Sequence, residues 1–316
     1  MRLRWPLFHF VFRNSTVNVT VECIAQLKQF QHWGYHLSGP SASEPAALAA
    51  LALCEQGEIK ASLKIARWLA ELQKSSGSVG VTAEHDTPAW PTSLAMLVWL
   101  VVKHTSSSDE FNAPVYHALQ WSLKSKGKTQ PRSPEIGHDP TLLGWSWAAN
   151  THSWMEPTCM FVLALKSGGQ FEHPRTRAGV EMITNRLLES GGCNFGSTVI
   201  LGQATLPQVQ STGLAMLALA DEDLIDVRID QSLTYLQREL GNDTSTASLC
   251  YGLLGLTAHG HRPQNAEQLL RHVLARELSN GASCYKLALI ALASMDDRSW
   301  MPQHRTRHKA TGSIGL

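Results

Sequence analysis

The chain has 316 residues, of which 43% are hydrophobic and 17% are charged, and its formal net charge is +1. This balance excludes the concentrated basic face that nucleic-acid binding requires, so we expect no nucleic-acid partner. No apolar run reaches the roughly 18 residues of a membrane-spanning helix, so we predict no transmembrane segment and a cytoplasmic protein, with peripheral membrane contact left open.

Residues 1–29 are predicted to hold a leading segment and a first helix that begins near Val21. Residues 1–13 combine a basic start with a short apolar stretch, which is typical of a targeting signal. They also contain Pro6 and His9, and no small-residue cleavage pattern follows them. The sequence therefore leaves open whether residues 1–13 are a targeting segment.

One stretch, Glu156-Pro157-Thr158 followed by a helix rich in Leu and small residues, recurs along the chain. A proline at the first helical position loses no hydrogen bond, and a carboxylate just before it faces the positive end of the helix dipole, so each copy is a helix start. A repeat of about 35 to 50 residues is typical of arrays of paired helices. The start positions of the copies are Pro45, Pro91, Pro157, Ser211, Ser248 and Cys284.

A second kind of helix, amphipathic and charged on one face, alternates with the repeated one and is predicted over 61–73, 114–123, 177–188, 230–240 and 264–278. The repeated helices carry almost no charge and must be buried nearly all round. Closing the pairs into a ring buries them, whereas an open solenoid would leave one side exposed. We therefore predict an all-α fold, an α/α toroid of about six helix pairs over 30–295, with few strands and a mobile C-terminal tail over 296–316.

The six cysteines show no C-x-x-C pairing, and four of them fall in or beside the repeated helices. This usage favours small buried thiols in a reducing compartment over disulfides.

The repeat resembles a known family. The pattern Pro-Thr-x-x-Leu-Ala-Leu, the Gly-rich loops at 76–80 and 191–196, and Trp68-Leu69-x-x-Leu72-Gln73 are similar to the prenyltransferase and squalene-oxidase repeat. The resemblance implies the toroid of terpenoid cyclases and protein prenyltransferases, and with it an isoprenoid or other apolar ligand in a central cavity.

The catalytic motifs of that family are degraded in this chain. Cyclases carry Asp-x-Asp-Asp-Thr, where this sequence has Ala83-Glu84-His85-Asp86-Thr87, so the resemblance implies Asp86 and His85 as altered catalytic candidates. The zinc ligands of prenyltransferases are not matched around Cys250, and His259 with His261 cannot share one helix face. We expect no metal and no cofactor.

In a toroid the inner helices all begin at one end, so the loops before them line the mouth of the cavity. The residues predicted to bind a ligand there are Trp33, Tyr35, Trp90, Trp145, Trp147, Trp154, Glu156 and Phe195. Aromatic faces bind hydrocarbon or stabilise cations. The dipole argument predicts lowered pKa values for Glu44 and Glu156, which makes them helix caps and poor proton donors.

Two function classes follow from these observations. The first is an isoprenoid-handling enzyme, cyclase-like or prenyltransferase-like, whose catalysis is unproven because its motifs are degraded. The second is a non-catalytic toroid that binds a peptide or a partner protein. Whether the chain is an enzyme is uncertain from its sequence.

Overall fold

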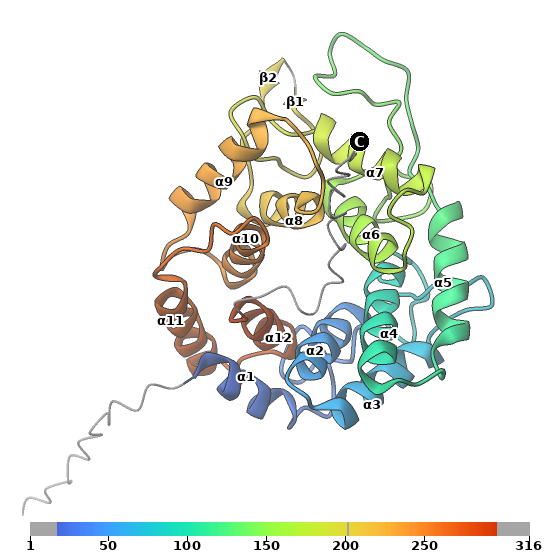
Figure 1. The fold of residues 1–316 in the computed structure, drawn as a ribbon, viewed down its shortest axis with the longest axis vertical. Helices are drawn as coiled ribbons and strands as arrows, with labels where there is room; N and C mark the ends of the chain where they lie inside the picture. Colours follow the sequence, from blue (N-terminus) through green and yellow to red (C-terminus); the bar gives the residue numbers. More distant parts are fainter. Residues whose placement is uncertain (1–17, 201, 296–316) are drawn as a thin grey trace, which may run out of the picture.

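The computed structural model describes residues 18–200 and 202–295, and the helices in these ranges form two concentric rings (Figure 1). The predicted targeting segment at 1–13 and the predicted tail at 296–316 lie outside the described residues. Among the helices that are described, none is both long and apolar enough to cross a membrane.

The inner ring consists of the repeated helices. Its members are almost uniformly apolar, and in the first of them every residue from Ser43 to Cys54 is buried. A helix that is apolar on all faces must be enclosed by other helices. The inner helices are α2 (Ser43–Glu55), α4 (Thr92–Ser106), α6 (Met155–Ser167), α8 (Val209–Leu219), α10 (Thr246–Ala258) and α12 (Cys284–Ala293).

The outer ring consists of helices with one buried face and one charged face. The sixth outer helix is α1, which packs against α11 and α12 and so completes the last pair. The outer helices are α1 (Val19–Leu27), α3 (Ile59–Glu71), α5 (Asn112–Lys124), α7 (Pro174–Asn185), α9 (Val227–Glu239) and α11 (Ala266–Ser279).

The ring is closed. Each inner helix packs against the next, and α12 packs against α2, so segments at opposite ends of the chain lie side by side (Figure 1). The closest approach is between α8 and α10, where Gly213 and Gly255 lie so near that a Cβ on Gly255 would stand 2.6 Å from the Gly213 carbonyl oxygen. The predicted all-α toroid of six helix pairs is confirmed, and the open solenoid is excluded.

A threonine in the first turn of three inner helices explains the Pro-Thr pattern of the repeat. The hydroxyl oxygens of Thr92, Thr158 and Thr212 are buried and accept hydrogen bonds from backbone N–H groups of the preceding loops, at 2.8, 2.9 and 3.0 Å. Each hydroxyl thereby satisfies a buried backbone donor that would otherwise be costly. The repeat residue anchors the loop that leads into its own helix.

The long connections gather at the end of the ring where the inner helices begin. They span 28–42, 72–91, 125–154 and 186–208, and the last contains the hairpin of β1 (Val199–Ile200) and β2 (Gln203–Ala204), which pair antiparallel with Val199 opposite Ala204. The connections at the other end are short. This asymmetry gives the molecule one face with enough irregular chain to build a site.

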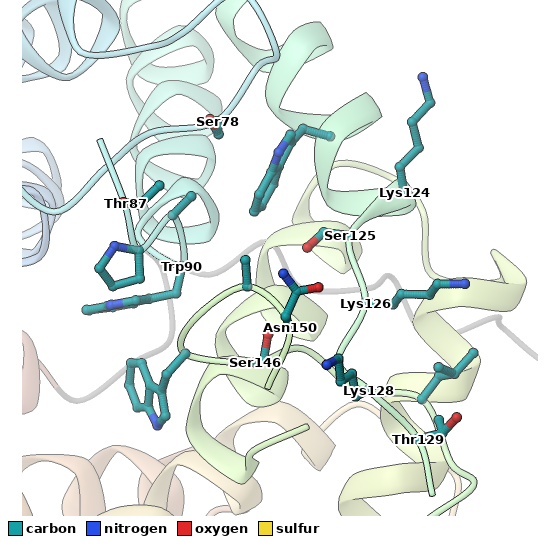
Figure 2. Close-up of a pocket in the computed structure, with 17 residues that line it drawn as sticks. Ser78, Thr87, Trp90, Lys124, Ser125, Lys126, Lys128, Thr129, Ser146 and Asn150 are labelled. Carbon is teal, nitrogen blue, oxygen red and sulfur yellow. The ribbon is translucent and has the colours of Figure 1, made fainter. Parts of the chain in front are cut away.

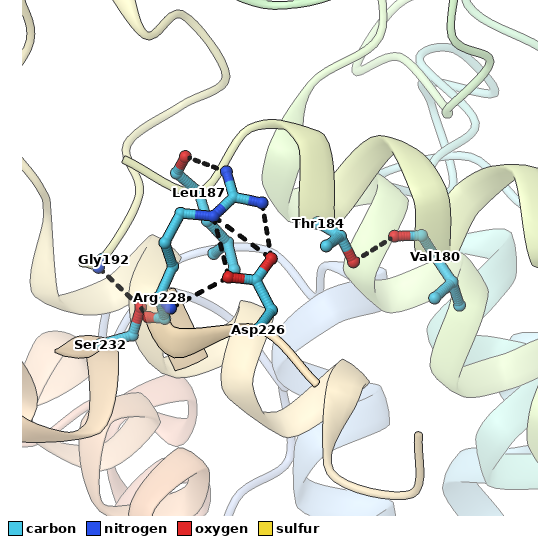
Figure 3. Close-up of polar contacts among 7 residues, drawn as sticks. All are labelled: Val180, Thr184, Leu187, Gly192, Asp226, Arg228 and Ser232. Carbon is cyan, nitrogen blue, oxygen red and sulfur yellow. Dashed lines mark hydrogen bonds and ion pairs between the residues drawn. The ribbon is translucent and has the colours of Figure 1, made fainter. Parts of the chain in front are cut away.

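The loop that precedes α8 is fastened to the outer helix α9 (Figure 3). The guanidinium of Arg228 forms an ion pair with Asp226 and donates a hydrogen bond of 2.9 Å to the carbonyl of Leu187. The buried hydroxyl of Ser232 accepts a hydrogen bond of 2.7 Å from the N–H of Gly192. These contacts fix both ends of the 187–192 segment, so the loop leaves α7 along a defined path.

Candidate functional site

Two buried carboxyl groups occupy equivalent positions at the loop-bearing end of the inner ring. Glu44 is the second residue of α2 and Glu156 is the second residue of α6, and each directly precedes a proline. Glu44 is 9% exposed and Glu156 is 7% exposed. The repeat therefore places two carboxyl groups at the same level of the ring, on two inner helices that have α4 between them.

Glu44 lies among tyrosines that come from distant parts of the chain. Its carboxylate accepts a hydrogen bond from the hydroxyl of Tyr35. The ring of Tyr35 lies 5.1 Å from that of Tyr285, and Tyr285 and Tyr251 are both close enough for the charge of Glu44 to raise their pKa values, after burial. The phenol of Tyr35 thus bonds to this carboxyl group, and the phenols of Tyr251 in α10 and Tyr285 in α12 lie within range of its charge.

Glu156 is held by polar groups of the neighbouring inner helix. The hydroxyl of Ser211 donates a hydrogen bond of 2.9 Å to one carboxylate oxygen, and the side-chain amide of Gln210 lies 3.4 Å from both oxygens. Gln210 occupies in α8 the position that Glu156 occupies in α6. The contact therefore joins equivalent residues of two consecutive repeats.

Burial sets the protonation of the pair. Loss of solvation, opposed by the hydrogen bond from the Tyr35 hydroxyl and reinforced by the charge of Glu156, raises the pKa of Glu44 to about 7. Burial also raises the pKa of Glu156, opposed by hydrogen bonds from Ser211 and Gln210. The expectation of lowered pKa values is wrong, because desolvation outweighs the helix dipole.

The predicted capping role is also wrong. The N-cap residues of α2 and α6 are Ala42 and Trp154, and neither makes a side-chain capping hydrogen bond. The carboxylates of Glu44 and Glu156 bond instead to side chains that come from outside their own helices. Both groups are therefore oriented toward the other elements of the ring.

A pocket of about 710 Å³ lies between the loops before α4 and α6, and neither Glu44 nor Glu156 belongs to its lining (Figure 2). Trp90, which directly precedes Pro91 as Glu44 and Glu156 precede their prolines, lies in the loop before α4 and forms part of one wall. Its ring meets that of Trp147 edge to face at 4.8 Å. On the opposite side lie Lys124, Lys126 and Lys128, of which Lys124 and Lys126 extend outward from the rim (Figure 2). We call this the Trp90 pocket.

The structure brings some of the predicted ligand-binding residues to this face and puts others in the core. Tyr35 bonds to Glu44, and Trp90 and Trp147 line the Trp90 pocket. Trp154 and Phe195 line a second, smaller pocket. Trp33 is buried and packs against Trp68 at a centroid distance of 5.6 Å. The ligand-binding role of all these residues stays a prediction.

Trp145 lies deepest of the predicted set. It is 1% exposed, stacks on Phe161 at 5.2 Å, and donates a hydrogen bond of 3.0 Å to the carbonyl of Ser122. The guanidinium of Arg175 lies 3.4 Å above its ring. These contacts join α5, α6 and α7, so Trp145 packs the space between the two rings.

The catalytic candidates Asp86 and His85 lie on an exposed turn. The Asp86 side chain is 58% exposed and stands 3.8 Å from the ammonium of Lys74, and a ring nitrogen of His85 lies 3.0 Å from the hydroxyl of Thr82. Neither contacts the carboxyl pair, and their catalytic role stays a prediction. Within the described residues, no three His, Cys, Asp or Glu side chains are grouped so that they could hold a metal ion.

Sequence reasoning missed Tyr251, Tyr285, Gln210 and Ser211 as neighbours of the carboxyl pair. Gln210 and Ser211 belong to the fourth copy of the repeat, so aligning the copies by position would have placed them beside Glu156. Tyr251 and Tyr285 lie inside apolar helices, four and two residues beyond the positions that align with Glu156, and give no comparable signal.

No protein-family model matches the chain, and no curated protein sequence is significantly similar to it. Several solved structures have a similar fold. One is an α-amylase from Clostridium perfringens, with a TM-score of 0.64, 9% identity, and coverage of 90% of this chain and 99% of that one. Another is an endoglucanase of glycosyl hydrolase family 8 from Klebsiella pneumoniae, with a TM-score of 0.58, 11% identity, and coverage of 88% and 99%. A third is an α-1,6-mannanase from a Salegentibacter species, with a TM-score of 0.54, 10% identity, and coverage of 87% and 97%.

These findings overturn the predicted membership of the prenyltransferase and squalene-oxidase repeat family and the isoprenoid or apolar ligand that it implied. The structures found to share the fold are glycoside-cleaving enzymes. The pattern Pro-Thr-x-x-Leu-Ala-Leu describes a buried helix that begins an inner wall, and any toroid needs such helices. At identities of 9 to 11% the likeness shows the fold, and the function must be argued from the site.

Proposed function

We propose that the protein is a glycoside hydrolase that acts on an oligosaccharide, with Glu44 and Glu156 as its carboxyl pair. The observation that carries the proposal is the placement of these two buried carboxyl groups at equivalent positions in α2 and α6, on the face that bears the long loops. Most glycoside hydrolases use two carboxyl groups that flank the scissile bond, one protonated and one ionised.

The surroundings of the two groups support different roles. Glu44 has a pKa of about 7, so it still carries a proton near neutral pH and can donate it to the oxygen of the leaving sugar. Glu156 accepts hydrogen bonds from Ser211 and Gln210, which favour its ionised form. As a carboxylate it can attack the anomeric carbon or activate a water molecule. In general, two carboxyl groups whose surroundings push their pKa values apart serve as the acid and the base.

A pocket among the long loops supports a sugar ligand. The Trp90 pocket joins aromatic walls with amide, hydroxyl and ammonium groups, among them Asn150 and Ser146. Aromatic faces cover the C–H face of a sugar ring, and the polar groups bond its hydroxyls. The solved structures with this fold are named as an amylase, an endoglucanase and a mannanase, all of which cleave bonds between sugars. The six free, buried thiols support a reducing, cytoplasmic compartment.

The test is release of reducing ends from a panel of glucose, mannose and uronic-acid oligosaccharides in α and β linkage. We expect cleavage of at least one substrate, and a loss of about 100-fold or more in kcat for Glu44→Gln and for Glu156→Gln. Glu71→Gln is the matched control, because Glu71 is an exposed carboxylate on the outer helix α3. Cleavage that survives in the double variant would disprove the assignment of the pair.

A further inference from the structure

The smaller pocket on the loop-bearing face is built around a buried cation. It has a volume of about 200 Å³ and lies between the loop before α6 and the loop before α8. Its lining includes Lys128, His138, His152, Trp154, Arg186 and Phe195. No Asp or Glu belongs to this lining. We call it the Arg186 pocket.

Arg186 ends α7 and is 5% exposed, yet its guanidinium is only partly bonded. One terminal nitrogen donates a hydrogen bond of 2.7 Å to the carbonyl of Ser153, whereas Nε is buried and has no partner. Within 18–200 and 202–295, no carboxylate forms an ion pair with Arg186. A buried cation without a counter-charge is costly, so a site that keeps one is suited to an anion.

Arg175 is a second arginine with a buried guanidinium, and all of its guanidinium nitrogens have hydrogen-bond partners. It is also largely buried, but its guanidinium donates to the carbonyl oxygens of Ser125, Leu143 and Gly144 and stacks on Trp145. Every nitrogen of that group has a structural partner. The unbonded Nε of Arg186 is therefore a property of its pocket and not of buried arginines in general.

The other groups around the pocket also lack an anionic partner. His138 has a buried Nδ1 with no hydrogen-bond partner, and burial followed by the charge of Arg186 lowers its pKa to about 4, so the ring is neutral. The nearby carboxylate of Asp139 is turned to Arg132 and Thr141. Gly196 leaves room for the guanidinium, since a Cβ there would stand 2.7 Å from a terminal nitrogen of Arg186.

The Arg186 pocket adjoins the Trp90 pocket. Lys128 lines both, and the Trp90 pocket also has no Asp or Glu in its lining. A ligand that stacks on Trp90 and Trp147 can therefore reach past Lys128 toward Arg186. Guanidinium and ammonium groups arranged in this way bind carboxylate or sulfate through charge-assisted hydrogen bonds.

We propose that the Arg186 pocket holds the anionic substituent of an acidic oligosaccharide whose sugar rings lie in the Trp90 pocket. The inference rests on the proposed function and names the substrate class of that same site: a glycan that carries a carboxylate or a sulfate ester. Arg186 and Lys128 bind the anion, and the tryptophans bind the sugar. The guanidinium of Arg186 and the ammonium of Lys128 act in binding and take no part in bond cleavage.

The test uses isothermal titration of the full chain with a trigalacturonate, its methyl ester, a sulfated trisaccharide and inorganic sulfate. We expect the wild type to bind one of the charged trisaccharides at least ten-fold more tightly than the uncharged ester. Which of the two binds identifies the anion. The inference would be overturned if neither charged trisaccharide bound more tightly than the ester, or if inorganic sulfate bound as tightly as the charged sugars.

Two variants locate the contact. Arg186→Gln should weaken binding of the charged trisaccharide at least ten-fold, with a smaller loss for Lys128→Gln. Lys128 is exposed, so its variant keeps the fold even where Arg186→Gln does not. Lys60→Gln is the control, an exposed lysine on α3. Unchanged binding in Lys128→Gln and in a folded Arg186→Gln would refute the site.

The outcome is separable from that of the proposed hydrolase. Charge-dependent binding without cleavage by the wild type would uphold this site and refute the hydrolase. Cleavage confined to neutral oligosaccharides would uphold the hydrolase and refute the acidic substrate. The Glu44→Gln/Glu156→Gln variant should keep the charge-dependent binding and lose the cleavage.

Discussion

Glu44 and Glu156 are single residues whose chemistry is set by what surrounds them. Both are carboxyl groups within the first turn of a helix, where the dipole favours the ionised form. Burial among tyrosines and apolar helix starts has the opposite effect and raises both pKa values. At this scale desolvation is the stronger effect, and it leaves a proton on a group that faces the ring.

The raised pKa of Glu44 predicts a pH-dependent stability. The folded state binds this proton more tightly, because the pKa of Glu44 is about 7 in the folded protein and 4.5 for an ordinary glutamate side chain. Protonation of Glu44 therefore stabilises the folded state fully below about pH 4.5, and this stabilisation is lost as pH rises through about 7. The loss in the free energy of unfolding is up to about 3 kcal/mol. Urea unfolding at pH 5 and pH 8 should show this loss in the wild type and not in Glu44→Gln. Parallel pH profiles for the two proteins would contradict it.

Glu222 is a second residue whose contribution to the stability of the protein depends on its partners. Its buried carboxylate pairs with Lys166 at 2.6 Å and with Arg177 at 2.5 Å, and the Lys166 side chain is itself 8% exposed. Glu222→Gln leaves that ammonium buried without its main counter-charge. We expect a loss of about 3 kcal/mol in the free energy of unfolding.

The control for Glu222 is Glu239→Gln, which removes an exposed ion pair with Arg238. That change should cost at most about 1 kcal/mol. Chemical denaturation of the two variants side by side gives the comparison. Equal losses would mean that the burial of the Glu222 pairs has no energetic consequence.

At the scale of the elements, the contact between α8 and α10 depends on residues without side chains. A Cβ at Gly213 would stand 2.3 Å from the carbonyl oxygen of Tyr251, and at Gly255 it would meet the Gly213 backbone. Backbone atoms cannot rotate aside as a flexible side chain can. The two helices would have to separate, in a part of the ring that also carries Gln210 and Ser211.

Gly213→Ala should therefore destabilise the protein, although alanine favours helix formation. We expect a loss of about 1 to 3 kcal/mol, the usual cost of overpacking, measured by thermal or chemical unfolding. Gly241→Ala is the control, because a Cβ at Gly241 meets nothing within 4 Å. If Gly213→Ala were as stable as Gly241→Ala, the contact between α8 and α10 would accommodate a Cβ without cost, which would contradict the prediction.

At the scale of the whole molecule, closure of the ring makes every helix pair dependent on two neighbours. The contact between α12 and α2 joins the ends of the described chain, so no pair is terminal. We expect unfolding in one transition, with far-ultraviolet circular dichroism and tryptophan fluorescence coinciding at every urea concentration. Two separated transitions would indicate that part of the ring unfolds alone, as in an open array.

The fold could be predicted from the sequence because the two helix types differ in composition, and the uncharged one can be buried all round only in a closed ring. The partners of Glu44 and Glu156 could not be predicted from the sequence, because Tyr35, Tyr251 and Tyr285 come together only when the ring is closed. The sequence around Arg186 does not show that it lacks a carboxylate partner either, since this depends on Asp139 pairing with Arg132 in the folded chain. The family was misassigned because the repeat encodes the wall of a toroid and not its ligand.

The most direct test of the carboxyl pair compares two leaving groups in Glu44→Gln. An acid that protonates the departing oxygen is needed for a sugar leaving group and is dispensable for nitrophenolate, which leaves without a proton. Using the oligosaccharide that the panel identifies and its nitrophenyl glycoside, we expect kcat/KM to fall about 100-fold or more on the former and less than about ten-fold on the latter. Equal losses on both substrates, or none on either, would contradict the assignment of Glu44 as the acid.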